Sequence, residues 1–187
     1  MGRGAKVAIG IGVVVLILYF LLASPYNRLV SQEEQVKQAG ANVEVMLNRR
    51  LDLIPNLVET VKGYASHERE TLEAVVKARQ QVASAGTLPG KLEANQMLTS
   101  ALSRLLVVVE RYPDLKASQN FRALQDQLEG TENRISVART RYNQAVKQYN
   151  TSIRSFPTVL LAKMMGFEAK KSFAAPEAAQ QAPKVKF

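Results

Sequence analysis

The sequence predicts an all-α protein in which an N-terminal transmembrane helix precedes an elongated antiparallel bundle of three to four long helices. Three observations support this fold class. An uncharged run covers Val7–Ala23, apolar residues then recur at alternating steps of four and three, and no alternation typical of β-strands appears. The chain has 187 residues, and those beyond the apolar run suffice for one domain with its own core.

The N-terminal end has the pattern of a membrane anchor. A short basic leader, residues 1–6, contains Arg3 and Lys6. As a helix, the Val7–Ala23 run would extend roughly 25 Å, which is the lower limit for crossing a hydrocarbon core. A cleaved signal peptide is the alternative, and it is disfavoured because Leu21 stands where the cleavage motif has a small residue.

Basic residues near the anchor predict its orientation. Arg3 and Lys6 lie within six residues of the N-terminus, whereas Arg28 and Lys37 follow the anchor at greater distances. The positive-inside rule favours a cytoplasmic N-terminus and a periplasmic domain, by a margin of about one charge.

Residues 26–157 are predicted to form the helical domain. Their first part has an apolar seam typical of one long packed helix, after a break or a bend at Ser24-Pro25. Pro55 lies inside the seam and predicts a kink near Asp52–Asn56, because proline removes a backbone N–H and clashes with the preceding turn. The seam residues are Leu47, Leu51, Ile54, Val58, Val61, Ala65, Leu72, Val75 and Val82.

Two further helices are predicted. A loop at Ser84–Gly90 precedes a helix at about Lys91–Arg111, and a long helix follows at about Gln119–Ser155. Gly130 within this last helix indicates a close helix approach or a local bulge. A strict seven-residue period predicts left-handed, coiled-coil-like packing. The residues at this period are Phe121, Leu128, Ile135, Tyr142, Tyr149 and Phe156.

The composition changes near the end of the chain. Residues 158–171 include an apolar stretch, too short to span a membrane, that either lies in the lipid interface or covers the end of the bundle. Residues 172–187 are rich in Ala, Pro, Gln and Lys, which predicts a disordered tail.

The composition also excludes several kinds of chemistry. With no Cys there can be no thiol catalysis, disulfide or thiolate metal site, and a single His excludes a His-rich metal site. No Gly-rich phosphate loop or Ser-His-Asp set is present, so we expect no enzyme activity and no cofactor. The net charge of +9 favours anionic lipid over nucleic acid as a partner, because the anchor places lipid head groups nearby.

Clusters of charged residues are the candidate interaction sites. One lies at the predicted kink and another on the third helix, and they would form either an anion or carboxylate site or an internal ion-pair layer that fixes register. His67-Glu68 does not complete a zinc motif, because the second His is missing. The candidates are Arg49, Arg50, Asp52, Asn56, His67, Glu68, Glu129, Glu132 and Arg134.

Ordered motifs lie along about Tyr26–Phe167. They are Tyr26–Val30, Arg49–Tyr64, His67–Glu70, Tyr112–Lys116, Asn120-Phe121, Leu128–Ile135, Arg141–Asn143, Tyr149-Asn150 and Phe156-Pro157. With these motifs the chain resembles LemA proteins. The resemblance implies a bacterial inner-membrane protein with a helical-bundle domain, no established enzyme activity and no known cofactor. Many members have a lipid-attachment Cys where this chain has Ala23-Ser24, so lipidation is not expected.

Three functions are compatible with these features. The favoured one is a homo-oligomeric scaffold that organises or shapes the membrane, because the predicted bundle is long and the anchor contains Gly10 and Gly12. An adaptor for an envelope complex such as a membrane-bound protease is the main alternative. Binding of nucleic acid or an anionic polymer is the third, and it requires a cytoplasmic domain. Resemblance supplies analogies for the first two: a related magnetosome protein is tied to membrane shaping, and some LemA genes adjoin that of a membrane-bound zinc protease.

Overall fold

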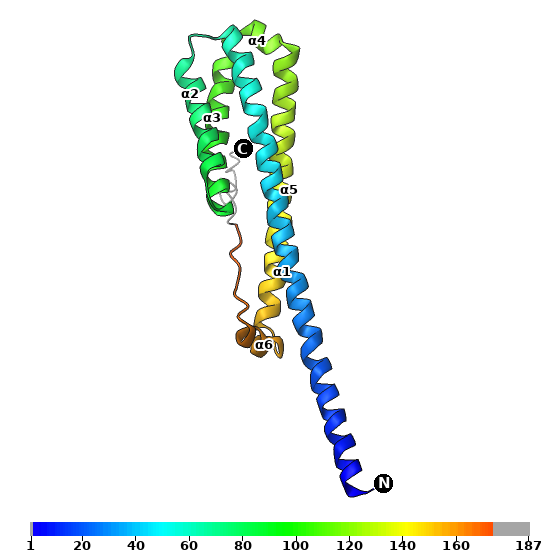
Figure 1. The fold of residues 1–187 in the computed structure, drawn as a ribbon. Helices are drawn as coiled ribbons and strands as arrows, with labels where there is room; N and C mark the ends of the chain where they lie inside the picture. The colour runs from blue at the N-terminus through cyan, green and yellow to red at the C-terminus, as the bar shows by residue number, and fades with distance from the viewer. Residues whose placement is uncertain (1, 174–187) are drawn as a thin grey trace, which may run out of the picture. The chain divides into compact units, whose positions relative to one another are not determined.

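The computed structural model describes residues 2–173; for several residues between 3 and 22 it describes the helical backbone without the side chain. These residues form helices joined by short turns, with no strand among them (Figure 1), so the prediction of an all-helical bundle is confirmed. The helices are α1 (Arg3–Tyr64), α2 (Arg69–Ser84), α3 (Leu88–Val109), α4 (Pro113–Ala117), α5 (Gln119–Arg154) and α6 (Thr158–Met165).

The chain divides into two compact units. Unit 1 comprises Met1–Gln38 and Tyr142–Phe187, and unit 2 comprises Ala39–Arg141. Helices α1 and α5 contribute to both units. The predicted boundaries of a single domain at residues 26–157 stay a prediction.

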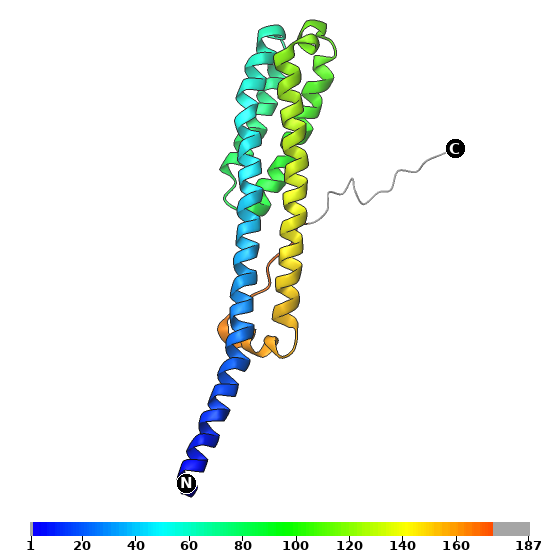
Figure 2. The ribbon, with the colours of Figure 1, turned by 90° about the vertical axis from the view of Figure 1, so that its right-hand side faces the viewer.

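Unit 2 is a four-helix bundle with one apolar core. Parts of α1 and α5 lie antiparallel beside the α2–α3 hairpin, and α4 closes the end where α1 stops (Figure 2). Leu115 of α4 is fully buried against this core. The helical segments pack through the apolar seam that the sequence predicts, and its most deeply buried members include Ile54, Val61, Val75, Leu98, Leu105 and Phe121.

The first seam belongs to two helices, α1 and α2, which corrects the prediction that one long helix contains it. The chain turns at residues 65–68, where the Ala65 N–H donates to the Val61 carbonyl and the Glu68 N–H donates to the Ala65 carbonyl. Ala65 stays buried in this turn, with 1% of its surface exposed. The apolar spacing therefore continues through the turn, and for this reason the spacing alone does not reveal the break.

Pro55 lies inside α1 without interrupting it, and the kink expected near Asp52–Asn56 stays a prediction. Proline has no N–H, which leaves the carbonyl four residues earlier, that of Leu51, without its helical donor. Arg79 of α2 supplies a replacement, because its Nε donates to the Leu51 carbonyl at 3.0 Å. A side chain from the neighbouring helix thus satisfies the backbone group that Pro55 leaves unpaired.

This arrangement predicts a coupling between Arg79 and Pro55. Arg79→Met is expected to lower the free energy of unfolding by about 1–2 kcal/mol, because a part-buried carbonyl loses its donor. In a Pro55→Ala background the helix regains its own N–H, so the same substitution should cost less than half as much. Urea unfolding followed by helical circular dichroism gives both values. Equal losses in the two backgrounds would show that Arg79 does not replace the missing donor.

The boundaries of α3 differ slightly from those predicted. The helix begins at Leu88, and Pro89 occupies its first turn, where a missing N–H costs nothing. The Thr87 side chain accepts a hydrogen bond from the Gly90 N–H at 3.3 Å and so caps this end. The helix therefore starts inside the stretch predicted as a loop and ends at Val109, two residues before Arg111.

Helix α5 follows its seven-residue pattern for most of its length. Phe121, Ile135 and Tyr149 are buried, but α5 ends at Arg154 and Phe156 is 83% exposed, so its predicted place in the seam is wrong. Gly130 does not mark a close approach, because a Cβ at this position would meet no atom within 4 Å.

Unit 1 has a smaller core of its own. Part of α1 packs against the end of α5 and against α6, with Leu29 and Tyr149 fully buried. The chain leaves α6 through Gly166, whose φ of 75° favours glycine, and continues as an extended segment. Ser172 and Phe173, predicted as part of the disordered tail, are placed beside α5, while residues 174–187 lie outside the described chain.

The predicted membrane anchor lies at the start of α1. Several side chains of Val7–Ala23 are outside the described part of the chain. Within the described part, no helix combines the length and the apolar character needed to cross a membrane. The spanning role of Val7–Ala23 and its orientation stay predictions.

Candidate functional site

Arg50 is the centre of a polar layer inside unit 2. This residue of α1 is only 4% exposed. Its Nη1 donates to the Asn95 Oδ1 at 2.8 Å and to the Thr99 Oγ1 at 3.1 Å, both on α3. The same nitrogen donates to the carboxylate of Glu132 on α5. One guanidinium therefore links three helices.

The electrostatics of the layer favour a structural role. Burial lowers the pKa of the Arg50 guanidinium from its ordinary value, and the negative charge of Glu132 opposes this shift. Arginine remains charged in proteins, so it does not serve as an acid or base near neutral pH. Its Nε is buried and has no hydrogen-bond partner among the residues that the structure describes. Arg50 also lines a cavity of about 170 Å³, whose other lining residues come mainly from α3 and α5.

The structure brings together only some of the predicted candidates. Arg50 and Glu132 meet in the layer, whereas Glu68 lies elsewhere, at the turn between α1 and α2. There it accepts hydrogen bonds from Arg111 at 3.0 Å and from the Tyr112 hydroxyl at 2.9 Å, and the latter raises the pKa of Tyr112. The remaining candidates are exposed on unit 2, namely Arg49, Asp52, Asn56, His67, Glu129 and Arg134.

Two members of the layer were missed by sequence reasoning. Asn95 and Thr99 lie four residues apart on α3, and with Leu102 they keep helical spacing on its inward side. A polar residue at such an apolar position is the signal that could have identified Asn95. Within residues 2–173, no group of three or more His, Asp or Glu residues is placed to hold a metal ion.

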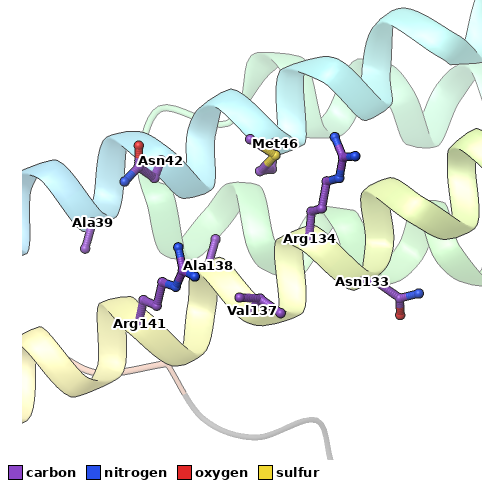
Figure 3. A pocket seen from close by; sticks show the side chains of 8 residues that line it. All are labelled: Ala39, Asn42, Met46, Asn133, Arg134, Val137, Ala138 and Arg141. Atoms are coloured by element: carbon purple, nitrogen blue, oxygen red, sulfur yellow. The ribbon is translucent and has the colours of Figure 1, made fainter.

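A second candidate site is a groove of about 480 Å³ between α1 and α5 of unit 2. Figure 3 shows Arg134 and Arg141 extending from α5 toward α1, while Asn133 points away. Met46 and Val137 supply apolar surface between the two arginines, and Val137 is 52% exposed. The groove thus combines an apolar floor with two positive charges, a chemistry that suits an acidic amphipathic segment.

The fold and its buried arginine layer define the class: an all-helical bundle protein whose internal polar groups join helices. Comparison with known sequences narrows this class. The sequence profile of the LemA family matches residues 39–187, so the chain belongs to the LemA family.

Several named relatives extend the match. Magnetosome protein MamQ of Magnetospirillum gryphiswaldense is 28% identical over 201 residues, covering 92% of this chain and 74% of the relative. Magnetosome protein MamQ 2 of Paramagnetospirillum magneticum is 27% identical with the same coverage. Protein LemA of Metamycoplasma hominis is 24% identical over 162 residues, which is 86% of this chain and 74% of the relative.

Proposed function

We propose that this LemA-family chain is a non-enzymatic, membrane-associated scaffold that assembles with copies of itself. The observation that supports the proposal is apolar surface that unit 1 leaves uncovered in two places. On α1, Ile11 is 61% exposed and Leu16 is 58% exposed. At and just before α6, Phe156, Leu160 and Met164 are 83%, 60% and 80% exposed, and they are four residues apart.

Phe156, Leu160 and Met164 form an apolar stripe, and the position of α6 favours lipid as the partner of this stripe. Ala162 belongs to the same small core as Leu29 of α1, and the Phe167 ring contacts the Tyr26 ring edge-on at 6.0 Å between centroids. Helix α6 is therefore packed just beyond the C-terminal end of Val7–Ala23. If that run crosses the inner membrane, α6 lies at head-group level, where an apolar stripe beside Lys163 suits anionic lipid.

Tryptophan reporters test the membrane contact, because the natural chain contains no Trp. Three single variants of the full chain, Leu16→Trp, Met164→Trp and Val107→Trp, would be reconstituted into phosphatidylcholine–phosphatidylglycerol vesicles. Val107 of α3 is the matched control, since it is 71% exposed on unit 2. We expect brominated lipids to quench the tryptophan fluorescence of the Leu16→Trp variant strongly, that of Met164→Trp moderately and that of the Val107→Trp control weakly. Equal quenching of the Met164 and Val107 reporters would contradict contact between α6 and lipid.

The self-assembly part of the proposal is supported by small residues on α1. Gly10 and Gly12 are exposed, and a Cβ on either would meet no atom of the described chain within 4 Å. Such positions let helices approach closely inside a bilayer. An N-terminus in the cytoplasm, with the helical units in the periplasm, is the orientation we favour, as the basic leader predicts.

An adaptor function is the second candidate, and the groove shown in Figure 3 favours it. Arg134 and Arg141 could pair with carboxylates of a partner segment whose apolar side lies on Val137. The partner would be an envelope protein, such as a membrane-bound protease, that carries an acidic amphipathic segment. Cross-linking in cells tests this: charge reversal with Arg134→Glu and Arg141→Glu should remove the partner. Recovery of no other protein with the natural chain would exclude the adaptor.

A further inference from the structure

An extended segment follows α6 and runs beside α5 in unit 1 (Figure 2). Two asparagines of α5 hold its backbone. The Asn150 side chain donates to the Lys170 carbonyl at 2.8 Å and accepts from the Lys170 N–H at 2.9 Å. Asn143 does the same with Phe173, at 3.0 and 2.8 Å. Each amide side chain thus pairs with a residue's N–H and C=O as a neighbouring β-strand would.

The spacing of the two asparagines sets the register of the segment. Seven residues of an α-helix advance about 10.5 Å, and three extended residues advance about 10 Å. Asn143 and Asn150 are seven apart, while Phe173 and Lys170 are three apart and run in the opposite direction. One heptad of α5 therefore matches three residues of an antiparallel extended chain.

Side chains at every third position add specificity. The Phe173 ring stacks on Tyr142 with 4.4 Å between centroids, and the Lys170 Nζ lies 2.7 Å from a Glu33 carboxylate oxygen. The same Nζ lies 5.8 Å from the centre of the Tyr149 ring. Phe167, three residues before Lys170, contacts Tyr26. The intervening residues 168, 169, 171 and 172 are exposed.

These contacts define a surface that recognises an extended segment of the form Phe-x-x-Lys-x-x-Phe; we call it the asparagine groove. Its members are Tyr26 and Glu33 of α1 with Tyr142, Asn143, Tyr149 and Asn150 of α5. Spacing of this kind, an aromatic residue three positions on each side of a Lys, occurs once in the chain, at Phe167–Phe173.

We propose that the asparagine groove of one copy binds the Phe167–Phe173 segment of a second copy and so links copies of the chain. This inference rests on the proposed self-assembly and names the contact that produces it. An exchanged segment makes the same hydrogen bonds, stacking contact and ion pair as the segment in its own chain. Exchange is facile because Phe167, Lys170 and Phe173 are only half-buried and the segment contributes no secondary structure of its own.

Engineered cysteines test the exchange in a chain that has none of its own. Lys147 and Ser172 line the same hollow beside the asparagine groove. One full-length copy would contain Lys147→Cys and a second, differently tagged, Ser172→Cys. After mixing in detergent and reconstitution into vesicles, mild oxidation should give a disulfide between the two tags. Gln148→Cys, also exposed on α5 but outside the hollow, measures the collision background.

Two variants check that recognition is specific. Adding Asn143→Ala and Asn150→Ala to the copy with Lys147→Cys should lower the yield of the linked product about tenfold, because four hydrogen bonds are lost. Charge reversal provides rescue. A Glu33→Lys copy should link poorly to a natural segment but well to a segment with Lys170→Glu.

The outcomes separate this inference from the proposed function. The exchange is overturned if disulfides form only within a chain that carries both cysteines while the vesicles still contain complexes of more than one copy. In that case self-assembly stays intact. If the asparagine substitutions leave the yield of linked product unchanged, the asparagine groove is not the binding surface. Single copies in every preparation would overturn both proposals.

Discussion

Replacing Glu132 with alanine is expected to lower the free energy of unfolding by about 3 kcal/mol, because it leaves the Arg50 charge buried without its carboxylate. Arg50 is 4% exposed, and its other acceptors, Asn95 and Thr99, are neutral. The Glu132 side chain is 41% exposed, so water can partly replace it and the expected cost is at the lower end of the range for buried pairs. Urea unfolding of the full chain, followed by circular dichroism, measures the loss.

The double variant separates the ion pair from the loss of side-chain volume. Arg50→Met with Glu132→Met removes both charges and retains apolar bulk, so it should cost clearly less than the sum of the two single substitutions. Arg134→Met, an exposed arginine on the same helix as Glu132, is the control and should change the free energy of unfolding by less than about 0.5 kcal/mol. Additive losses for Arg50 and Glu132 would contradict the coupled layer.

Replacing Tyr149 with alanine is expected to cost about 3–5 kcal/mol of unfolding free energy. Tyr149 is fully buried in the core of unit 1, together with residues of α1 and α6, and alanine would leave a cavity there. Phe156 occupies the next position of the seven-residue pattern but is 83% exposed. Phe156→Ala should therefore change the unfolding free energy by less than about 0.5 kcal/mol.

This pair of substitutions tests the end of α5 directly. Both residues are aromatic and seven apart, so a seam that continued through Phe156 would give similar losses for the two variants. Unfolding by urea in mild detergent, where exposed apolar residues stay soluble, gives both values under one condition. A large loss at Phe156 would show that the core continues through Phe156 and would contradict its exposed position.

Local patterns made much of the fold predictable. Apolar spacing and the absence of strand alternation indicate helices, and the seven-residue period identifies the buried side of α5 as far as Tyr149. The end of α5 at Arg154 lies one residue from the predicted Ser155. The exposure of Phe156 was not predictable from spacing, because Phe156 keeps the period although it follows the end of the helix.

The continuous helix at Pro55 and the turn at Ala65 both depend on contacts between distant residues. Pro55 frees the Leu51 carbonyl, and Arg79 provides a donor for it from a different helix. Ala65 keeps the seam in phase through the turn because its own side chain is buried, although the turn around it is exposed. Neither contact can be inferred from the local sequence.

Sequence reasoning located the candidate sites only in part. The motifs around Arg50 and Glu132 indicated an ion-pair layer, and the structure pairs these two residues; their joint functional role stays untested. Asn95 and Thr99 belong to no charged motif, so they were not recognised. The Tyr-Asn pairs at 142–143 and 149–150 repeat seven residues apart, but their partner is an extended segment with no periodic signal of its own.

The number of copies per complex in a membrane tests the central proposal most directly. The full chain would be labelled through Val107→Cys, at an exposed position of α3, and reconstituted into vesicles at low density. Single-molecule photobleaching would then count the copies in each complex. The proposed scaffold predicts several bleaching steps per complex, with the distribution shifting toward single steps in the Asn143→Ala, Asn150→Ala variant. Protein that fails to enter the vesicles, or that shows one step at every density, would contradict a self-assembling membrane scaffold.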